Sequence, residues 1–243
     1  MSAEEEFERR NREMIERLGG DPELRELTRR WFARVSQLEY SYHFRWMGRP
    51  VIQYPQDLVA AQEILWRVKP DLVIETGIAH GGSLIFYASI LELIGRGHVV
   101  GIDIDIRPHN RQAIEAHPMF RRIELIEGSS TDAGVFARVR EGAAGQQTVL
   151  VALDSNHTHD HVLAELRLYS QLVTPGSYLI AFDTIVEEMP PELSANRPWK
   201  PGDSPATAVR QFLAETDRFV VDEEMDRKLL ITVAPGGYLR CVK

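Results

Sequence analysis

Short apolar runs alternate with amphipathic segments along most of the chain after Pro55, a pattern typical of strands that alternate with helices. We predict five strands, at Leu72–Glu75, Val99–Asp103, Ile123–Glu127, Thr148–Asp154 and Tyr178–Asp183. We predict helices around and between them, at Gln56–Val68, Ser83–Leu93, Arg111–Ala116, Ala133–Arg140 and His161–Leu172. Apolar strands separated by helices favour a parallel sheet that is covered on both faces.

The pattern changes near the C-terminus. After a predicted helix at Ala206–Thr216, two apolar runs at Phe219–Asp222 and Lys228–Val233 are joined by a short acidic turn. This arrangement indicates a hairpin, so the sheet is expected to end with an antiparallel strand. Before it, Glu187–Pro205 holds five prolines and shows no periodicity. A loop of that length inside a domain is often functional, and a lid is expected.

Two amphipathic helices are predicted between Glu4 and Leu38, with Asp21 as the cap of the second and Pro22 at its first position. They could pack on the sheet domain or on another subunit, and a homo-oligomer formed through them is expected. The aromatic stretch from Tyr40 to Leu58 is predicted to be an ordered loop. We therefore divide the chain into an N-terminal extension, residues 1–54, and a sheet domain, residues 55–243.

Composition and charge narrow the possible partners. The chain is 44% hydrophobic and 26% charged, as in ordinary soluble globular proteins, and its formal net charge is −8. A net negative chain without basic clusters argues against a nucleic-acid partner. No apolar run is long enough to span a bilayer, and the N-terminus lacks the apolar core of a signal peptide. The single cysteine, Cys241, agrees with a reducing compartment, and a cytoplasmic location is expected.

A glycine-rich turn follows the first predicted strand. Val73–Ser83 reads V-I-E-T-G-I-A-H-G-G-S, which is a strand, a turn with Gly77, Gly81 and Gly82, and a helix start at Ser83. Such a turn lets the backbone approach a ligand, although a plain tight turn is the alternative. The spacing is not the G-x-G-x-x-G fingerprint of dinucleotide sites, and Glu75 would repel a pyrophosphate.

Acidic and hydroxyl side chains recur where the other strands end. Asp103 is placed to accept hydrogen bonds from a ribose, with Asp105 two residues later, and Ser129 and Ser130 could meet an adenine ring. An isolated aspartate at such a position is more often a helix cap than a ligand, and a local turn explains Ser129 and Ser130 equally well. Their recurrence at successive strand ends favours a ligand site.

The segment Leu153–Val162, L-D-S-N-H-T-H-D-H-V, contains three histidines and two aspartates. A zinc site is one interpretation, but Thr158 stands where a hydrolytic H-E-x-x-H motif needs glutamate. The alternative is a hard cation on Asp154 and Asp183, with His157 as a general base. His159 and His161 are then expected to cap or line the following helix.

Several of these blocks together resemble the cephalosporin hydroxylase / rhamnosyl O-methyltransferase family of S-adenosylmethionine-dependent, class I methyltransferases. The resemblance runs from about Tyr40 to the C-terminus. It rests on Gly48-Arg49-Pro50, Gln53-x-Pro55-x-Asp57, Ile74–Ser83, Gly101–Arg107, Leu153–Val162 and Phe182–Thr184.

The resemblance implies a Rossmann-like α/β fold whose mainly parallel seven-stranded sheet includes an antiparallel strand near the C-terminus. It implies that Glu75 and the Gly77–Ser83 turn hold the methionine part of S-adenosylmethionine, with Asp103 on the ribose and Ser129–Ser130 beside the adenine. By similarity to metal-dependent relatives, Asp154 and Asp183 would bind Mg²⁺. Those relatives carry an acidic pair where this chain has Phe182 followed by Asp183, which weakens the expectation of magnesium.

The resulting hypothesis is an S-adenosylmethionine-dependent O-methyltransferase that acts on a sugar hydroxyl, such as a deoxyhexose of a glycoside, glycolipid or polysaccharide precursor. The mechanism would use His157 as base and a metal for assistance. Two alternatives stay open at this stage: an NAD-dependent oxidoreductase on the same kind of sheet, and a non-catalytic binding or assembly protein.

Overall fold

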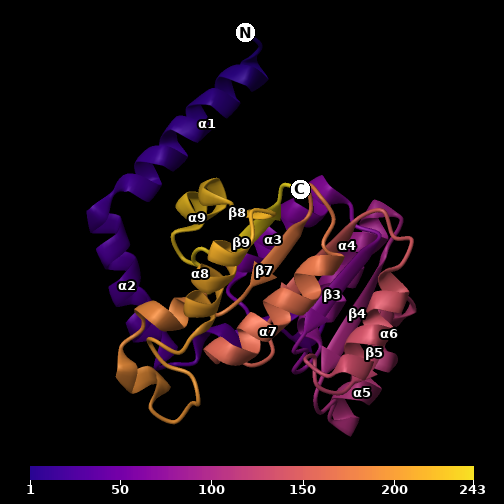
Figure 1. Ribbon diagram of the computed structural model, residues 1–243. Coiled ribbons are helices and arrows are strands. Elements are labelled where there is room, and N and C mark those ends of the chain that lie inside the picture. The colour runs from indigo at the N-terminus through magenta and orange to yellow at the C-terminus, as the bar shows by residue number, and fades with distance from the viewer.

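A seven-stranded sheet lies at the centre of the protein, as the computed structural model of residues 1–243 shows (Figure 1). Its strand order is β5-β4-β3-β6-β7-β9-β8. The strands are β3 Leu72–Thr76, β4 His98–Asp103, β5 Ile123–Glu127, β6 Val149–Leu153, β7 Tyr178–Ala181, β8 Phe219–Val221 and β9 Tyr238–Cys241. The strands from β3 to β7 pair in parallel, and β9 runs antiparallel to both β7 and β8. This confirms the predicted seven-stranded, mainly parallel sheet.

Helices cover both faces of the sheet because alternate strand residues point to opposite sides. On β3, Val73 packs in the cluster that includes α3 and α4, whereas Leu72 and Ile74 pack in the cluster of α6, α7 and α8. The helices are α3 Pro55–Val68, α4 Gly82–Ile94, α5 Pro108–Glu115, α6 Ala133–Ala143, α7 His159–Tyr169, α8 Pro205–Glu215 and α9 Glu223–Leu229. Burial of one such aliphatic side chain stabilises the fold by about 1.5–3 kcal/mol.

The strand order reverses next to β3. The chain passes from β3 through α4 to β4 on one side, and it returns after β5 to place β6 on the other side. The connections therefore diverge above the carboxyl ends of β3 and β6. In open parallel sheets a crevice for ligands lies at this point.

Two helices precede the sheet domain, α1 Ala3–Gly20 and α2 Pro22–Ser36, as predicted. The Asp21 carboxylate caps α2 by accepting hydrogen bonds from the N–H groups of Glu23 and Leu24. In Figure 1, α1 extends away from the rest of the molecule, and it contacts α9 near its C-terminal end, where Arg227 pairs with Glu16. No helix in the structure combines the length and apolar character that crossing a membrane requires.

The aromatic stretch is an ordered strap, residues 40–54, that joins α2 to α3. It contains a 3₁₀ turn at Tyr40–His43 and a two-stranded ribbon of β1 Arg45–Trp46 and β2 Arg49–Pro50. The rings of Phe32 on α2 and Tyr54 at the end of the strap stack at 4.7 Å, in the same core cluster as α3 and α4. The predicted boundary between residues 54 and 55 stays a prediction.

The predicted C-terminal hairpin is wrong in its second strand. Residues Glu223–Leu229 form helix α9, and the antiparallel strand lies further along the chain at Tyr238–Cys241. The Asp222 carboxylate accepts a hydrogen bond from the Met225 N–H, and acidic residues fill the first turn of α9. These are helix-starting features, so the acidic segment that we interpreted as a turn begins a helix instead.

Candidate active site

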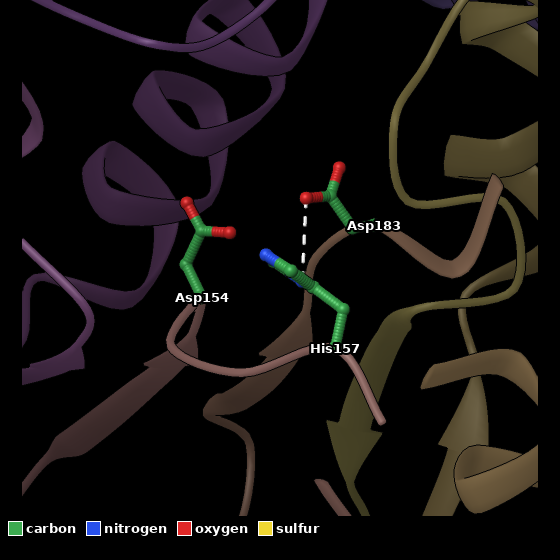
Figure 2. A group of neighbouring side chains, drawn as sticks. All are labelled: Asp154, His157 and Asp183. Carbon is green, nitrogen blue, oxygen red and sulfur yellow. Dashed lines mark ion pairs between the residues drawn. The ribbon is translucent and has the colours of Figure 1, made fainter. Parts of the chain in front are cut away.

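Three side chains from neighbouring strand ends meet at the crevice (Figure 2). Asp154 directly follows β6, His157 lies in the loop from β6 to α7, and Asp183 lies just after β7. One ligand atom of each lies within 4.8 Å of the others. His157 Nδ1 lies 3.3 Å from Asp183 Oδ2, and in Figure 2 the imidazole ring sits between the two carboxylates. The structure thus brings together the residues predicted as metal ligands and general base.

Asp183 reaches this cluster through an unusual backbone conformation. Its φ is 55° and its ψ 23°, in the left-handed region that side-chain-bearing residues adopt at a cost of about 1–3 kcal/mol. The preceding Phe182 is buried in the hydrophobic cluster of α3 and α4, and its N–H donates to the Leu153 carbonyl. Position 182 therefore contributes packing and offers no oxygen to the site, while Asp183 is turned toward it.

The cluster lines a cavity of about 570 Å³. The sheet side of the cavity includes Gly77, Gly82, Ser83 and Asp103 from the predicted cofactor site. Two other segments form its outer walls: the end of α2 with the strap, and the chain from Ile185 to Trp199. Tyr40, Tyr42, Tyr54 and Trp199 are the aromatic residues contributed by these walls, together with Phe32 of α2. The segment predicted as a lid thus borders the site.

Gly77 is required by a close backbone contact between β3 and β6. Its φ is +80°, and a Cβ atom there would lie 2.1 Å from the carbonyl oxygen of Asp154. The turn that follows is held by Asp103, whose Oδ2 accepts hydrogen bonds from the N–H groups of Ile78 and Ala79. The predicted ribose-binding carboxylate therefore also supports the glycine turn.

Glu75 is fully buried below the turn and does not line the cavity. Its Oε2 accepts a hydrogen bond of 2.9 Å from the hydroxyl of Ser83, which does line the cavity. Burial raises the pKa of Glu75 to about 8, with a smaller contribution from the charge of Asp103. Glu75 is thus connected to the cavity through Ser83, and its predicted role toward the methionine group stays a prediction.

Four other predicted cofactor residues lie outside the cavity lining. Gly81 packs against the Ile114 side chain, and Asp105 is exposed beside Asp103. Ser129 Oγ lies 3.0 Å from the Thr131 hydroxyl, and Ser130 is buried and bonded to His161. The adenine role of Ser129 and Ser130, the supporting role of Asp105 beside the ribose and the role of Gly81 in the methionine turn stay predictions.

The remaining histidines of the segment have structural partners. His159 Nδ1 lies 2.8 Å from the Thr207 hydroxyl on α8, and its Nε2 lies 3.1 Å from Gln211 Oε1. His161 Nε2 lies 3.0 Å from Ser155 Oγ, which donates to the buried Glu165. Neither histidine lines the cavity, which agrees with the expectation that they line or cap the helix.

Two site residues were not predicted from the sequence. Gln53 of the strap donates a hydrogen bond of 3.1 Å from its Nε2 to Asp154 Oδ2. The ring of Trp199 packs edge-on against His157, with 4.6 Å between centroids. The block Gln53-x-Pro55-x-Asp57 was a signal for the first, and the aromatic residue in the proline-rich loop was a signal for the second.

The residues present fit a hard divalent cation. Burial, followed by the charges of Asp183 and Glu75, raises the pKa of Asp154 well above its ordinary value. Crowded carboxylates of this kind are stabilised by a cation, and carboxylate oxygens are ligands that Mg²⁺ prefers. Asp154 and Asp183 could hold the ion, with His157 beside them.

A second cavity of about 410 Å³ lies between the α1–α2 elbow and α9. It is lined by polar residues that include Arg25, Arg29 and Asp226. Phe32 and Ile185 line both cavities and so separate the second from the first.

Residues 38–242 match the model of the family described as Rhamnosyl O-methyltransferase/CmcI. The chain belongs to this family. It is 30% identical over 203 residues to a rhamnosyl O-methyltransferase of Mycobacterium tuberculosis (strain ATCC 25618 / H37Rv), covering 80% of this chain and 76% of that protein. The rhamnosyl O-methyltransferase of Mycobacterium leprae (strain TN) is 30% identical over 196 residues, with 80% and 81% covered.

Solved structures show the same fold. A structure of CmcI with Mg and S-adenosylmethionine superposes with a TM-score of 0.60 at 19% identity, over 83% of this chain and 78% of that one. An O-methyltransferase from Bacillus cereus in complex with S-adenosylhomocysteine gives 0.52 at 17% identity, over 89% and 90%. The predicted family and the class I methyltransferase fold are confirmed, and the enzyme class is S-adenosylmethionine-dependent O-methyltransferase. This class replaces the NAD-dependent oxidoreductase and non-catalytic alternatives.

Proposed function

We propose that this protein transfers the methyl group of S-adenosylmethionine to a hydroxyl group of a sugar, with a divalent cation at Asp154 and Asp183 and His157 as general base. The observation that carries the proposal is the meeting of these three side chains in a cavity at the switch point of the sheet. The rhamnosyl O-methyltransferase relatives support a deoxyhexose acceptor.

The two substrates would bind on different sides of the cavity. The turn from Gly77 to Ser83, with Asp103, is the side for the methyl donor. The strap and the segment Ile185–Trp199 form the side for the acceptor. Aromatic rings such as Tyr40 and Trp199 suit the apolar faces of a sugar ring, and they exclude water when the ring is bound.

His157 is placed to move a proton. Its Nδ1 is close to Asp183 Oδ2, which favours the tautomer with the proton on Nδ1 and leaves Nε2 free to accept the proton of the acceptor hydroxyl. The nearby Trp199 ring limits how the imidazole can rotate. When bound, Mg²⁺ would act as a Lewis acid that favours alkoxide character, and S-adenosylmethionine would supply the methyl group.

We further propose that α1 and α2 mediate association with a second copy of the chain. Only Ile15 and Gly19 of α1 are buried, whereas Phe7 and Met14, seven positions apart, are 65% and 41% exposed. Most of the stability of helices in proteins comes from packing of an apolar face, and the N-terminal part of α1 leaves Phe7 and Met14 unpacked. Light scattering on the full chain and on a Phe7→Glu/Met14→Glu variant tests this, and a wild-type monomer would exclude it.

The test of the activity is an incubation of the protein with S-adenosylmethionine, Mg²⁺ and a panel of rhamnosides and other deoxyhexosides. We expect a product heavier by one CH₂ unit and an equal amount of S-adenosylhomocysteine. Production of S-adenosylhomocysteine only with acceptors that lack a sugar would contradict the sugar assignment while leaving the transferase class in place.

A further inference from the structure

Gln53 is the polar residue of the strap that touches the catalytic cluster directly. It lines the cavity, yet only 5% of its surface is exposed. Its Nε2 donates to Asp154 Oδ2 at 3.1 Å. Burial of a polar amide is unfavourable unless its groups form hydrogen bonds, so the depth of the Gln53 side chain indicates a specific role.

The partner fixes the orientation of the amide. With a cation bound, Asp154 is a carboxylate without a proton and only accepts hydrogen bonds, so the NH₂ end of Gln53 faces Asp154 and the carbonyl end faces away. Oδ2 of Asp154 accepts this hydrogen bond, and a carboxylate oxygen of Asp154 also lies in the cluster with His157 and Asp183.

The carbonyl oxygen of Gln53 has no donor. Oε1 is buried, and no protein group lies within hydrogen-bond reach of it. Buried acceptors left without a donor are uncommon, and a bound ligand or ion often provides one. Since Oε1 is shielded from the cavity, the fold accepts the cost of this unpaired oxygen in order to keep the amide against Asp154.

Contacts with the glycine turn and with the start of α4 fix the position of the strap, and with it the position of Gln53. Pro50 lies so close to the start of α4 that a Cβ atom on Gly82 would be 2.0 Å from its carbonyl oxygen. The Arg49 guanidinium donates to the His80 carbonyl and to Asn110 Oδ1. Val51, next in the strap, is 1% exposed. Gln53 thus reaches Asp154 from a segment anchored to the glycine turn itself.

We propose that Gln53 is a positioning residue of the metal site, which holds Asp154 through a hydrogen bond to its Oδ2 and so orients this ligand toward the cation. The inference rests on the proposed metal site at Asp154 and Asp183. Mg²⁺ in proteins usually keeps several waters, and the outer partners of its ligands tune its affinity. The strap, outside the predicted sheet domain, then takes part in metal binding.

The test compares Gln53→Met with Gln56→Met. Methionine keeps the length of glutamine and removes both amide groups. Gln56, on α3, also has a buried Oε1 without a partner but does not line the cavity, so it is a matched control. Calorimetric titration of Mg²⁺ into protein that holds S-adenosylhomocysteine gives the metal affinity, and paramagnetic resonance with Mn²⁺ gives a second measure.

We expect Gln53→Met to weaken Mg²⁺ binding by about 10-fold to 100-fold. Gln56→Met should bind Mg²⁺ like wild type, and S-adenosylhomocysteine affinity should be equal in all three proteins. Equal Mg²⁺ affinity in wild type and Gln53→Met would overturn the inference and leave the proposed function standing. Loss of S-adenosylhomocysteine binding with Mg²⁺ binding intact would also overturn it, since Gln53 would then support the methyl-donor site and not the metal site.

Wild-type protein that binds neither Mg²⁺ nor Mn²⁺ would remove the metal from the proposed function and this inference with it. Thermal unfolding of each variant checks that it is folded. If Gln53→Met unfolds, Gln53→Asn carries the same test, because it keeps the amide but withdraws it from Asp154 by one methylene. Its Mg²⁺ affinity should fall in the same direction.

Discussion

His157 Nδ1 lies 3.3 Å from Oδ2 of Asp183, so one carboxylate both borders the proposed cation site and orients the proposed base. The two roles meet at the end of β7, where the chain turns through a left-handed conformation. The role of the base and the role of the cation can therefore be tested with different variants.

Removal of the base should affect chemistry and leave binding of the methyl donor intact. We expect His157→Gln to lower kcat by about 10²-fold to 10⁴-fold, the usual contribution of a general base. S-adenosylhomocysteine affinity, measured by calorimetry, should stay unchanged. His159→Gln is the control, because His159 contacts α8 and lies outside the cavity. Unchanged turnover in His157→Gln would exclude it as the base.

Removal of the cation should also lower turnover. We expect excess EDTA to abolish most activity and Mg²⁺ to restore it. Asp183→Asn should behave like the chelated enzyme, and asparagine tolerates the left-handed backbone of this position. At a Mg²⁺ concentration of about 100 times Kd, wild type should gain about 2.7 kcal/mol of stability, and Asp183→Asn much less. Full activity in EDTA would show that the transfer needs no metal.

A methyl group at Gly77 should displace the backbone of Asp154. Gly77→Ala combines a φ of +80° with a contact of 2.1 Å to the Asp154 carbonyl. Gly95→Ala is the matched control, because its φ is +86° but nothing lies within 4 Å. We expect the control to lose about 1 kcal/mol and to keep its activity, since only the backbone cost applies. Gly77→Ala should lose clearly more stability and most of its activity; equal effects of the two substitutions would contradict this account.

Asp57 should be among the most important polar residues for stability. It is 1% exposed on α3, and its carboxylate accepts hydrogen bonds from the Thr232 hydroxyl, the Val233 N–H and the Tyr238 hydroxyl. Asp57→Leu would leave three buried donors unpaired. We expect the free energy of unfolding, measured in urea, to fall by about 2–4 kcal/mol. Asp57→Asn retains one acceptor oxygen, so its free energy of unfolding should fall by less.

The dependence of stability on pH should include a contribution from Asp226. Burial raises the pKa of this carboxyl from 3.8 to about 7, and its Oδ1 has no partner. The folded state therefore binds more protons than the unfolded state between these values, so the free energy of unfolding should fall as pH rises through this window. One group changes it by at most about 1.4 kcal/mol per pH unit.

Asp226→Asn keeps the oxygen that accepts from the Gly236 N–H and removes the titration. Its stability relative to wild type should therefore increase between pH 4 and pH 8, two values that bracket the titration range from about 4 to about 7. Chemical unfolding at both pH values measures the difference. A constant difference between the two proteins would show that Asp226 keeps an ordinary pKa when folded.

The sheet could be predicted because its strands are short apolar runs with clear limits. Ile123–Glu127 was predicted without error, and Leu72–Glu75 missed only Thr76. The pattern failed at Lys228–Val233, where apolar residues at the end of a capped helix look like a strand. The true last strand, Tyr238–Cys241, has only four residues and no independent signal, since its position depends on pairing with β7 and β8.

The cluster of Asp154, His157 and Asp183 was also predictable, because parallel strands end at one edge of the sheet. The contact of Gln53 with Asp154 was not. These residues are 101 positions apart, and the strap that joins them has no periodic pattern. The burial of Glu75 could not be predicted either. The sequence shows that an acid lies at the strand end, but not that Ser83 separates it from the cavity.

Phe32 and Ile185 line both cavities, so their side chains limit how far the first cavity extends toward α2. A smaller side chain at position 32 would thin the boundary between the two cavities, on the side where Arg25 and Arg29 of α2 line the second cavity. Because the Phe32 ring stacks on Tyr54, such a change would cost stability, about 3–5 kcal/mol for a buried phenylalanine. The boundary of the cavity and the packing of α2 against the strap therefore depend on the same aromatic ring.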